Sequence, residues 1–497
     1  MSAATTQPVT GPFLIVNPKA HLGGSETLRL ALLTDELAAR FDIDVLFTAQ
    51  HVDLRMVAGR TGRLCVTAQH MDPITPGRGM GRILPESLVE AGARAVVTSD
   101  PSAALASGAD PARVIVVDDV EKAIGALARA NLQRARAEGN PALKVVAVTG
   151  SVGKTTVKDL LASLVESRGP VIAPPGSFNN ELGLPITVLR TDAGTATLVL
   201  EMGADHVGNI DYLTSIAPPD ASAVLIVARA HLGEFGGIDN VGRAKSELVT
   251  GTREGGVVVL NADDPRVAAM AGLAHGPVLT FSARGAGDVA ARNIDVGADG
   301  RASFTLVTPE GEADVKLRLV GEHHVANALA AAALAHSLGI ATAQIASTLS
   351  AVGAASPHRM DVFEAGGATV IDDSYNANPD SMRAGLAALE RLGRGRRKVA
   401  VLGEMLELGE ASLLEHEAIG KAAAQAGVAC LVAVGEEARP LASAAEAEGV
   451  DATWAAGPEG ALRELDAALA AGDVVLVKGS NGSGVWKVAD SLREEKK

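Results

Sequence analysis

Lys154, Thr155 and Thr156 stand where a buried strand gives way to a helix, an arrangement that suits phosphate chemistry. The segment VVAVTGSVGKTTVKDLLASLV, residues 145–165, runs from apolar, mostly β-branched residues through a short glycine loop into a helical pattern. This order places the backbone amides of residues 150–155 at a helix N-terminus, where N–H groups and the helix dipole favour a phosphate. Lys154 would reach the β- and γ-phosphates of a nucleotide, and the Thr155 hydroxyl would hold Mg²⁺. The predicted nucleotide-binding residues are Gly150, Ser151, Gly153, Lys154, Thr155 and Thr156.

The spacing of this loop, G-x-x-G-K-T, is two residues shorter than the common P-loop pattern, because Val148 stands where its first glycine would be. The strand before the loop and the helix after it favour a nucleotide site. The alternative is an ordinary strand–turn–helix with an exposed lysine.

Further polar side chains follow the next predicted strands. Asn179 and Asn180 lie in GSFNNELGLPITVL, Glu201 ends a strand, and His231 follows the strand ASAVLIVA, with Lys245 on the helix after it. Because α/β proteins bind ligands at the carboxyl ends of their strands, we expect the P-loop threonine, Glu201 and His231 to form a magnesium and phosphate pocket. Mg²⁺ prefers oxygen ligands, which favours Glu201 over His231. Taken singly, each has an ordinary structural alternative. Glu201 could cap a helix, His231 could be a loop histidine, and Lys245 could be a solvated helix residue.

Strand-like apolar runs alternate with Ala- and Leu-rich helical stretches along nearly the whole chain, which predicts an α/β fold of parallel sheets flanked by helices. At 497 residues the chain is too long for one core, so three domains are expected. Polar segments with Gly and Pro at 135–144 and 351–359 suggest the boundaries. The predicted domains are an N-terminal α/β domain over 1–140, a central domain over 141–352 and a C-terminal domain over 353–497. Short alternating runs between 285 and 320 predict a small antiparallel insert outside the main sheet.

Composition limits the partners and the compartment. The formal net charge is −15, and GRGRR at 393–397 is the one basic cluster, which we expect to be a solvated loop, so nucleic-acid binding is not indicated. Cys65 and Cys430 lie far apart and have no Cys-x-x-Cys partner, so neither a disulfide framework nor a thiolate metal site is indicated. The polar first residues and the lack of a membrane-length apolar run predict a soluble cytoplasmic protein without a membrane partner. We expect a monomer that acts on small molecules.

The order of these motifs resembles that of the Mur ligases. The matching signatures, between about residues 113 and 480, are TGSVGKTT, FNNELGLPITVL, EMGADHVGNI, HLGEFGGIDNVGRAKSEL, NADDP, HHVANALAAAALA, IDDSYNANPDSM, GEMLELG, EHEAIG and VKGS. IDDSYNANPDSM is the most specific of them and is most similar to the branch that adds D-alanyl-D-alanine to a UDP-muramoyl-tripeptide in peptidoglycan synthesis. The resemblance implies a central P-loop ATPase-type domain and a Rossmann-like C-terminal domain that binds the amine. It also implies ATP-dependent amide-bond formation through an acyl phosphate, with release of ADP and phosphate.

The resemblance assigns roles to single residues. Lys154 contacts the phosphates, Thr155 and Glu201 hold one Mg²⁺, and His231 holds a second. Lys245 matches a lysine that is carbamylated in Mur ligases, which turns an ammonium into a carboxylate-like metal ligand. The implied catalytic set is Lys154, Glu201, His231 and Lys245. The other implied contacts are Asn327 near the adenine, Arg359 and Asp373 at the nucleotide, and Asn180, Tyr375, Asn376, Asn378 and Lys478 on the substrate side. Tyr375 is alternatively a loop aromatic buried for packing.

The N-terminal segment lacks the uridine-binding signature of that branch. PFLIVNPKAHLGG and the segments after it resemble the first half of an archaeal-type triosephosphate isomerase, with Asn17 and Lys19 at its substrate-binding positions. The catalytic histidine is not kept, because Thr98-Ser99-Asp100 occupies that segment. About a hundred residues cannot close an eight-stranded barrel, which takes about 250. We therefore expect a partial α/β domain without isomerase activity, which serves either substrate recognition or structure.

Two departures from the family pattern lie closer to the site. His324 stands where the family usually has Asn, and VKGSNGSGVWKV lacks the Arg and Met that commonly follow the motif of Lys478. With the unusual N-terminal segment, they keep open a second hypothesis, the same chemistry on a different acid and amine in a specialised peptide pathway. A third hypothesis, a nucleotide-dependent scaffold without catalysis, predicts a broken metal set, whereas every expected metal ligand is present. The family further implies that the third domain closes about a hinge at residues 353–357.

Overall fold

The chain divides into two compact units, Met1–Ala123 and Ile124–Lys497. The computed structural model describes residues 13–16, 25–41, 44–49, 65–68, 96–106, 111–228, 235, 237–285, 287–353 and 356–494. Within these ranges no helix combines the length and the apolar character needed to cross a lipid bilayer.

The N-terminal unit contains short parallel sheets. Three strands pair in the order β1-β2-β3, two others pair as β4-β5, and all of these pairings are parallel. The described elements are β1 (Phe13–Val16), α1 (Ser25–Phe41), β2 (Asp44–Ala49), β3 (Cys65–Ala68), β4 (Val96–Thr98), α4 (Pro101–Ala106), a 3-10 turn (Pro111–Arg113) and β5 (Val114–Val116). Asn17 and Lys19 lie outside the described residues. The likeness of this unit to half an isomerase barrel stays a prediction.

A nine-stranded sheet forms the first part of the second unit, in the order β14-β13-β12-β11-β10-β9-β6-β8-β7. Its strands are β6 (Lys144–Thr149), β7 (Val171–Ile172), β8 (Thr197–Glu201), β9 (Ala221–Val224), β10 (Val257–Asn261), β11 (Val278–Ser282), β12 (Val289–Val296), β13 (Arg301–Thr308) and β14 (Gly311–Val320). The pairings from β7 to β12 are parallel, and the last two are antiparallel. The alternation of apolar runs and helices correctly predicts the parallel part.

The expectation of a separate insert between 285 and 320 is wrong. The segment is antiparallel as predicted, but β12 pairs in parallel with β11 at Phe281↔Val289 and Ser282↔Ala290, so it continues the main sheet. The link between the two strands is short, and its described residues, 283–285, 287 and 288, form turns and bends. The sheet is therefore extended at this edge by a hairpin whose alternate residues still reach the core.

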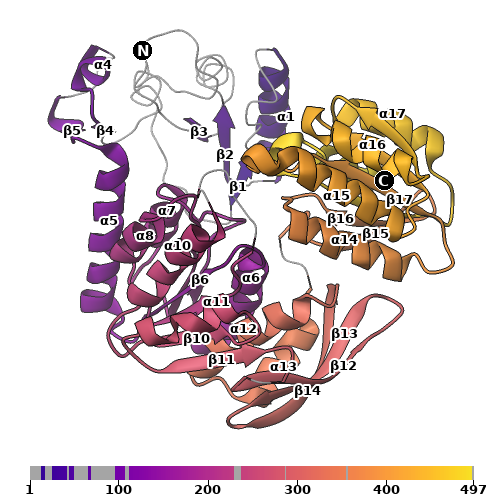
Figure 1. Ribbon diagram of the computed structural model, residues 1–497. Coiled ribbons are helices and arrows are strands. Elements are labelled where there is room, and N and C mark those ends of the chain that lie inside the picture. The colour runs from indigo at the N-terminus through magenta and orange to yellow at the C-terminus, as the bar shows by residue number, and fades with distance from the viewer. Residues whose placement is uncertain are drawn as a thin grey trace. The chain divides into compact units, whose positions relative to one another are not determined.

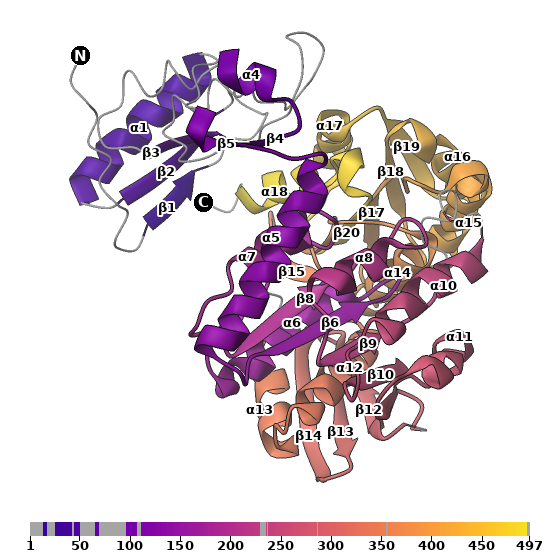
Figure 2. The ribbon, with the colours of Figure 1, turned by 90° about the vertical axis from the view of Figure 1, so that its left-hand side faces the viewer.

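Helices cover both faces of this sheet (Figures 1 and 2). Successive residues of β6 point to opposite faces, so that Val146 and Val148 enter one core while Val145 and Ala147 enter the other. The first core takes residues of α6 (Lys154–Val165), α12 (His324–Ser337) and α13 (Thr342–Ala351). The second takes residues of α5 (Val120–Arg134), α7 (Gly183–Leu189), α8 (Asn209–Ile216), α10 (Ile238–Thr250) and α11 (Pro265–Ala268). The P-loop helix α6 therefore packs on this face of the sheet with α12 beside it.

A second sheet, coloured orange to yellow in Figure 1, has the order β15-β16-β20-β17-β18-β19. Its strands are β15 (Asp361–Ala365), β16 (Ala368–Asp373), β17 (Lys398–Gly403), β18 (Cys430–Val434), β19 (Asp451–Ala455) and β20 (Val474–Lys478). Only β15 is antiparallel to its neighbour. Residues of α14 (Pro379–Leu392), α15 (Ser412–Gln425) and α16 (Arg439–Ala447) fill one core, and α17 (Pro458–Ala468) and α18 (Trp486–Glu494) fill the other. The result is the predicted α/β architecture. The predicted limits at 140 and 352 fall in the links before β6 and after α13 and remain predictions.

Close packing of α15 on α16 depends on Gly420, and Gly420→Ala is expected to destabilise the protein by about 1–3 kcal/mol. A Cβ at residue 420 would lie 2.3 Å from the Leu441 carbonyl oxygen and 2.9 Å from the Ala444 Cβ, so the helices must separate. Chemical denaturation measures the change. The control is Gly272→Ala, where a Cβ meets nothing within 4 Å. Equal stabilities of the two variants would contradict this account.

Candidate active site

The P-loop is built at the carboxyl end of β6, between β8 and β9. The Ser151 amide donates to the Ile226 carbonyl (2.9 Å) and its hydroxyl to the Ala228 carbonyl (3.1 Å), which ties the loop to the segment after β9. Gly153 begins α6 with a φ of 85°, and a Cβ there would lie 2.4 Å from Asn327 Oδ1. Glycine is therefore required at 153 both for its backbone conformation and for space.

Lys154 is folded back over this loop, where its Nζ donates to the Gly150 carbonyl at 2.9 Å. Burial lowers the pKa of Lys154, the Glu201 carboxylate opposes that change, and the Arg359 guanidinium adds to it. The ammonium is thus poorly compensated by the protein alone. A bound polyphosphate would supply the missing negative charge.

Glu201 and Thr155 form the buried centre of the site. The Thr155 hydroxyl donates to Glu201 Oε2 at 2.8 Å, and Asn179 Nδ2 donates to Glu201 Oε1 at 2.7 Å. Glu201 is 1% exposed and Thr155 is 3% exposed. A carboxylate and a hydroxyl that meet beside a phosphate loop are the kind of oxygen set that holds Mg²⁺ together with nucleotide phosphates. The residues present therefore fit one magnesium ion.

The two neighbouring asparagines differ in their use. Asn179 contacts Glu201, whereas Asn180 Oδ1 accepts from the Gly183 amide at 2.8 Å and so caps the first turn of α7. Both asparagines still line the recess beside Lys245. The sequence marked Asn180 as the substrate contact, while the side chain that reaches the Glu201 carboxylate is Asn179.

Lys245 projects from α10 into the same recess as Lys154. It is 4% exposed, and burial together with the Lys154 charge lowers the pKa of its amine to about 7. In the described part of the chain, no carboxylate pairs with Lys245, and no group of three or more His, Cys, Asp or Glu side chains is placed to hold a metal ion. The predicted second ligand, His231, lies outside the described residues.

The far end of the cavity contains Asn327 and His324. Asn327 Nδ2 lies 3.2 Å from His324 Nδ1, and burial holds the pKa of His324 well below its usual value. Since an amide nitrogen donates, Nδ1 accepts, and the ring proton belongs on Nε2. His324 Nε2 is buried, and none of the residues that the structure describes forms a hydrogen bond with it. This wall therefore offers an unsatisfied N–H donor where the family pattern has an asparagine.

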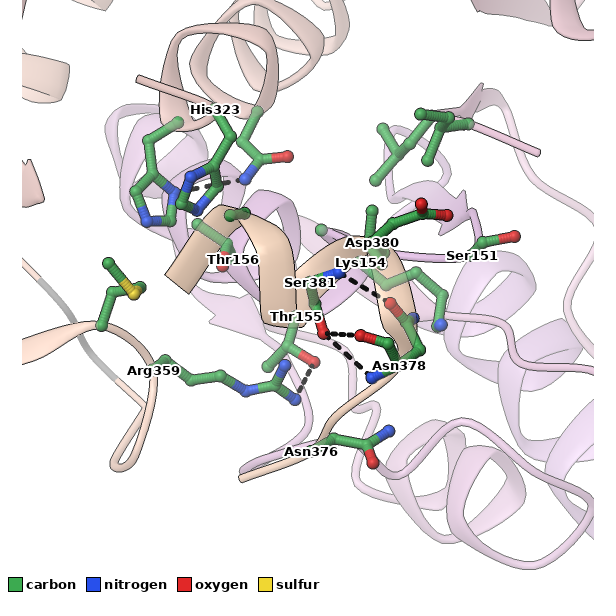
Figure 3. A pocket seen from close by; sticks show the side chains of 18 of the residues that line it. Ser151, Lys154, Thr155, Thr156, His323, Arg359, Asn376, Asn378, Asp380 and Ser381 are labelled. Carbon is green, nitrogen blue, oxygen red and sulfur yellow. Dashed lines mark hydrogen bonds between the residues drawn. The ribbon is translucent and has the colours of Figure 1, made fainter. Parts of the chain in front are cut away.

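Arg359, in the link just before β15, extends to the start of the P-loop helix (Figure 3). Its Nη2 donates to the Thr155 hydroxyl at 3.0 Å, and its guanidinium carbon lies 3.9 Å from the centre of the Tyr375 ring. The Tyr375 hydroxyl in turn contacts the Ser177 hydroxyl. Tyr375 thus makes polar and cation–π contacts across the site in addition to packing. Ser177 was not singled out in the sequence, although it precedes the two asparagines in the same motif.

The loop after β16 is held from beneath by a buried ion pair. Lys478 Nζ lies 2.5 Å from Asp373 Oδ2 and donates to the Asn376 carbonyl at 3.0 Å. Asn378 Oδ1 accepts from the Ser381 amide at 2.9 Å, so its side chain caps α14. Lys478 is therefore in a position to shape this loop.

One cavity of about 460 Å³ joins these groups. The predicted residues that line it are Ser151, Gly153, Lys154, Thr155, Thr156, Glu201, Asn327, Arg359, Asp373, Tyr375, Asn376, Asn378 and Lys478. Gly150, Asn180 and Lys245 line the adjoining recess with Lys154. Phosphate-binding, metal-binding and acceptor-side candidates from distant segments therefore meet in one place.

Two family models match the chain. The Mur ligase middle domain matches residues 148–335, and the model described as "Mur ligase, glutamate ligase domain" matches residues 358–481. The first match runs from within β6 to within α12 and the second spans β15 to β20, so each covers most or all of one sheet of the second unit.

Named relatives agree with these matches. The UDP-N-acetylmuramoyl-tripeptide–D-alanyl-D-alanine ligase of Mycobacterium tuberculosis is 47% identical over 371 residues, which are 70% of this chain and 73% of that protein. The crystal structure of MurF from Acinetobacter baumannii is similar with a TM-score of 0.72 and 32% identity, over 82% of this chain and 86% of that one. The structure of MurF ligase from Thermotoga maritima in complex with ADP gives a TM-score of 0.70 and 28% identity, over 82% and 90%.

Lys245→Met is expected to stabilise the protein more at about pH 6 than at about pH 9 in CO₂-free buffer. With a folded-state pKa of about 7, the buried amine disfavours protonation relative to the unfolded chain, whose lysines titrate near about 10.4. The cost of the charge is complete below the folded pKa and shrinks as pH rises between the two values. Thermal unfolding across this pH range measures the difference, with exposed Lys421→Met as the control. A pH-independent difference for Lys245→Met would contradict the assignment of this buried charge.

Proposed function

The chain belongs to the Mur ligase family, and we propose that it joins D-alanyl-D-alanine to a UDP-N-acetylmuramoyl-tripeptide. It is an ATP-dependent ligase. The observation that carries the substrate assignment is that P-loop residues Lys154 and Thr155 share one cavity with the loop Asp373–Asn378 of the second matched domain. The relatives that carry both parts at up to 47% identity are named for this reaction.

In the proposed first step, a carboxylate oxygen of the tripeptide attacks the γ-phosphorus of ATP. The bond to the bridging oxygen breaks, ADP leaves, and an acyl phosphate remains. Lys154, the P-loop amides and Arg359 neutralise charge that spreads over the phosphate oxygens. Their placement around the Thr155 hydroxyl supports this role.

In the second step, the amine of D-alanyl-D-alanine attacks the acyl carbon, and inorganic phosphate leaves with its bonding electrons. The amine must approach as a free base, and the proton that it loses when the amide forms is taken up by the departing phosphate. We assign its binding to the loop that carries Tyr375, Asn376 and Asn378. The Lys478–Asp373 pair supports this loop from its buried side. Alignment of the two substrates supplies much of the rate enhancement.

Magnesium neutralises phosphate charge in such reactions when bound. Thr155 and Glu201 would hold one ion, and His231 with a carbamylated Lys245 would contribute to a second. The low pKa of Lys245, about 7, supports carbamylation because the neutral amine is the form that reacts with CO₂. The resulting carboxylate would also replace an ammonium that repels metal ions.

Coupled assays of phosphate release and product mass test the substrate assignment. The purified protein with ATP and Mg²⁺ is expected to release phosphate only when UDP-N-acetylmuramoyl-tripeptide and D-alanyl-D-alanine are both present, with an amide product. Lys154→Ala and Glu201→Gln should each lower the rate by about 10²-fold or more, while Lys421→Ala keeps it. Nucleotide binding without stimulation by this substrate pair would overturn the assignment and favour another acid and amine.

Chemical rescue tests carbamylation. Lys245→Ala is expected to lose activity and to regain part of it with added acetate or propionate, because a small carboxylate can occupy the space of the carbamate. The same acids should not rescue Glu201→Ala with a similar concentration dependence, since the recess beside Lys245 is a separate one. Full activity of Lys245→Ala without additive would show that no carbamate is needed.

A further inference from the structure

Arg359 is flanked by two residues in an uncommon backbone conformation. His358 has a φ of 59° and Met360 a φ of 52°, the left-handed region that non-glycine residues seldom adopt. Such conformations persist where the surrounding structure enforces them. The guanidinium of Arg359 leaves this turn to meet the Thr155 hydroxyl and the Tyr375 ring. The direction of Arg359 therefore depends on what holds the turn.

The His358 side chain is anchored on a buried carboxylate. His358 Nδ1 lies 2.9 Å from Asp372 Oδ2, and Asp372 is 0% exposed. The Ser374 hydroxyl donates to the other oxygen, Asp372 Oδ1, at 2.6 Å. The His358 carbonyl also accepts from the Tyr375 amide at 3.1 Å. The side chain of His358 is thus bonded to the end of β16, and its backbone to the loop Asp373–Asn378 that follows.

We propose that His358 is a positioning residue: its imidazole, anchored on Asp372, holds the left-handed turn that directs Arg359 to Thr155 and Tyr375. The inference rests on the proposed function, in which Arg359 neutralises phosphate charge. His358 touches no reacting atom, and it acts through Arg359. The glycine that would adopt this turn without strain could not supply the anchor, which gives a physical reason for an imidazole here.

The charges around His358 favour the anchored, protonated ring. The hydrogen bond to Asp372 raises the pKa of His358, burial opposes the change, and Asp490 Oδ1 adds attraction at 3.8 Å from Nε2. Arg493 of α18 acts in the other direction and itself reaches Asp372 at 3.4 Å and Asp361 at 2.8 Å. The His358 ring thus faces two aspartates and one arginine beside the C-terminal sheet.

A double-mutant cycle on the full chain tests the proposal. His358→Ala is expected to weaken ATP affinity and raise the KM for ATP by about tenfold, within the range for residues of one network. In an Arg359→Ala background the same change should cost less than about twofold, because the group to be positioned is already missing. His358→Gly should resemble His358→Ala, since glycine permits the left-handed conformation but does not hold it without the anchor. His358→Asn should recover most of the affinity.

Three outcomes would overturn the proposal. They are wild-type affinity in His358→Gly, equal losses from His358→Ala with and without Arg359, and no loss in either background. Asn293→Gly, another left-handed residue that is exposed on β12, controls for backbone relief alone. Calorimetry measures the affinity for ATP and Mg²⁺ without the other substrates. The double-mutant cycle therefore gives a result even if the proposed tripeptide and dipeptide are not the substrates. Failure of the proposed function appears separately, as an unmutated chain that binds ATP and makes no amide.

Discussion

The Thr155 hydroxyl is the point on which the two halves of the site converge. A hydroxyl has one proton to donate and two lone pairs that accept, and Thr155 gives its proton to Glu201 while it accepts from Arg359. Glu201 reaches it because β6 and β8 are adjacent parallel strands whose carboxyl ends share an edge. Arg359 reaches it from the link that leads into β15 of the other sheet. Both hydrogen bonds of this one oxygen atom therefore depend on the positions of the two sheets.

Electrostatics divides the site into two parts of different character. On the C-terminal side, Lys478 is buried against Asp373, so charge is neutralised within the protein. On the P-loop side, Lys154 and Lys245 share a recess, and burial lowers the pKa of both. A buried cation without sufficient compensation is unfavourable, and an incoming triphosphate relieves it. The P-loop side of the site therefore favours binding of an anion, whereas the charges on the C-terminal side neutralise each other within the protein.

The sequence predicted those features that arise from local order. A strand, a glycine loop and a helix are contiguous in the chain, so the position of Lys154 at the start of α6 could be predicted without the structure. The choice between Asn179 and Asn180 could not be predicted. It depends on which side chain bonds to the backbone at the first turn of α7 and which one remains to contact Glu201. The continuation of the main sheet into β12 depends on a strand pairing that no periodicity reveals. The anchor of His358 joins a linker to a strand end and a C-terminal helix, and such contacts are set by tertiary packing.

The location of Trp486 has a spectroscopic consequence. The chain has two tryptophans, Trp454 on β19 of the C-terminal sheet and Trp486 on α18, which packs on that sheet. The Trp486 ring centre lies 6.1 Å from that of His358, whereas Trp454 Nε1 donates to the Gly435 carbonyl at 2.7 Å and its ring stacks on Arg439. Intrinsic tryptophan fluorescence therefore originates in the C-terminal part of the chain alone. Its Trp486 component depends on the surroundings of His358, the residue next to Arg359. The molecule carries its own optical reporter of these surroundings, without an added dye.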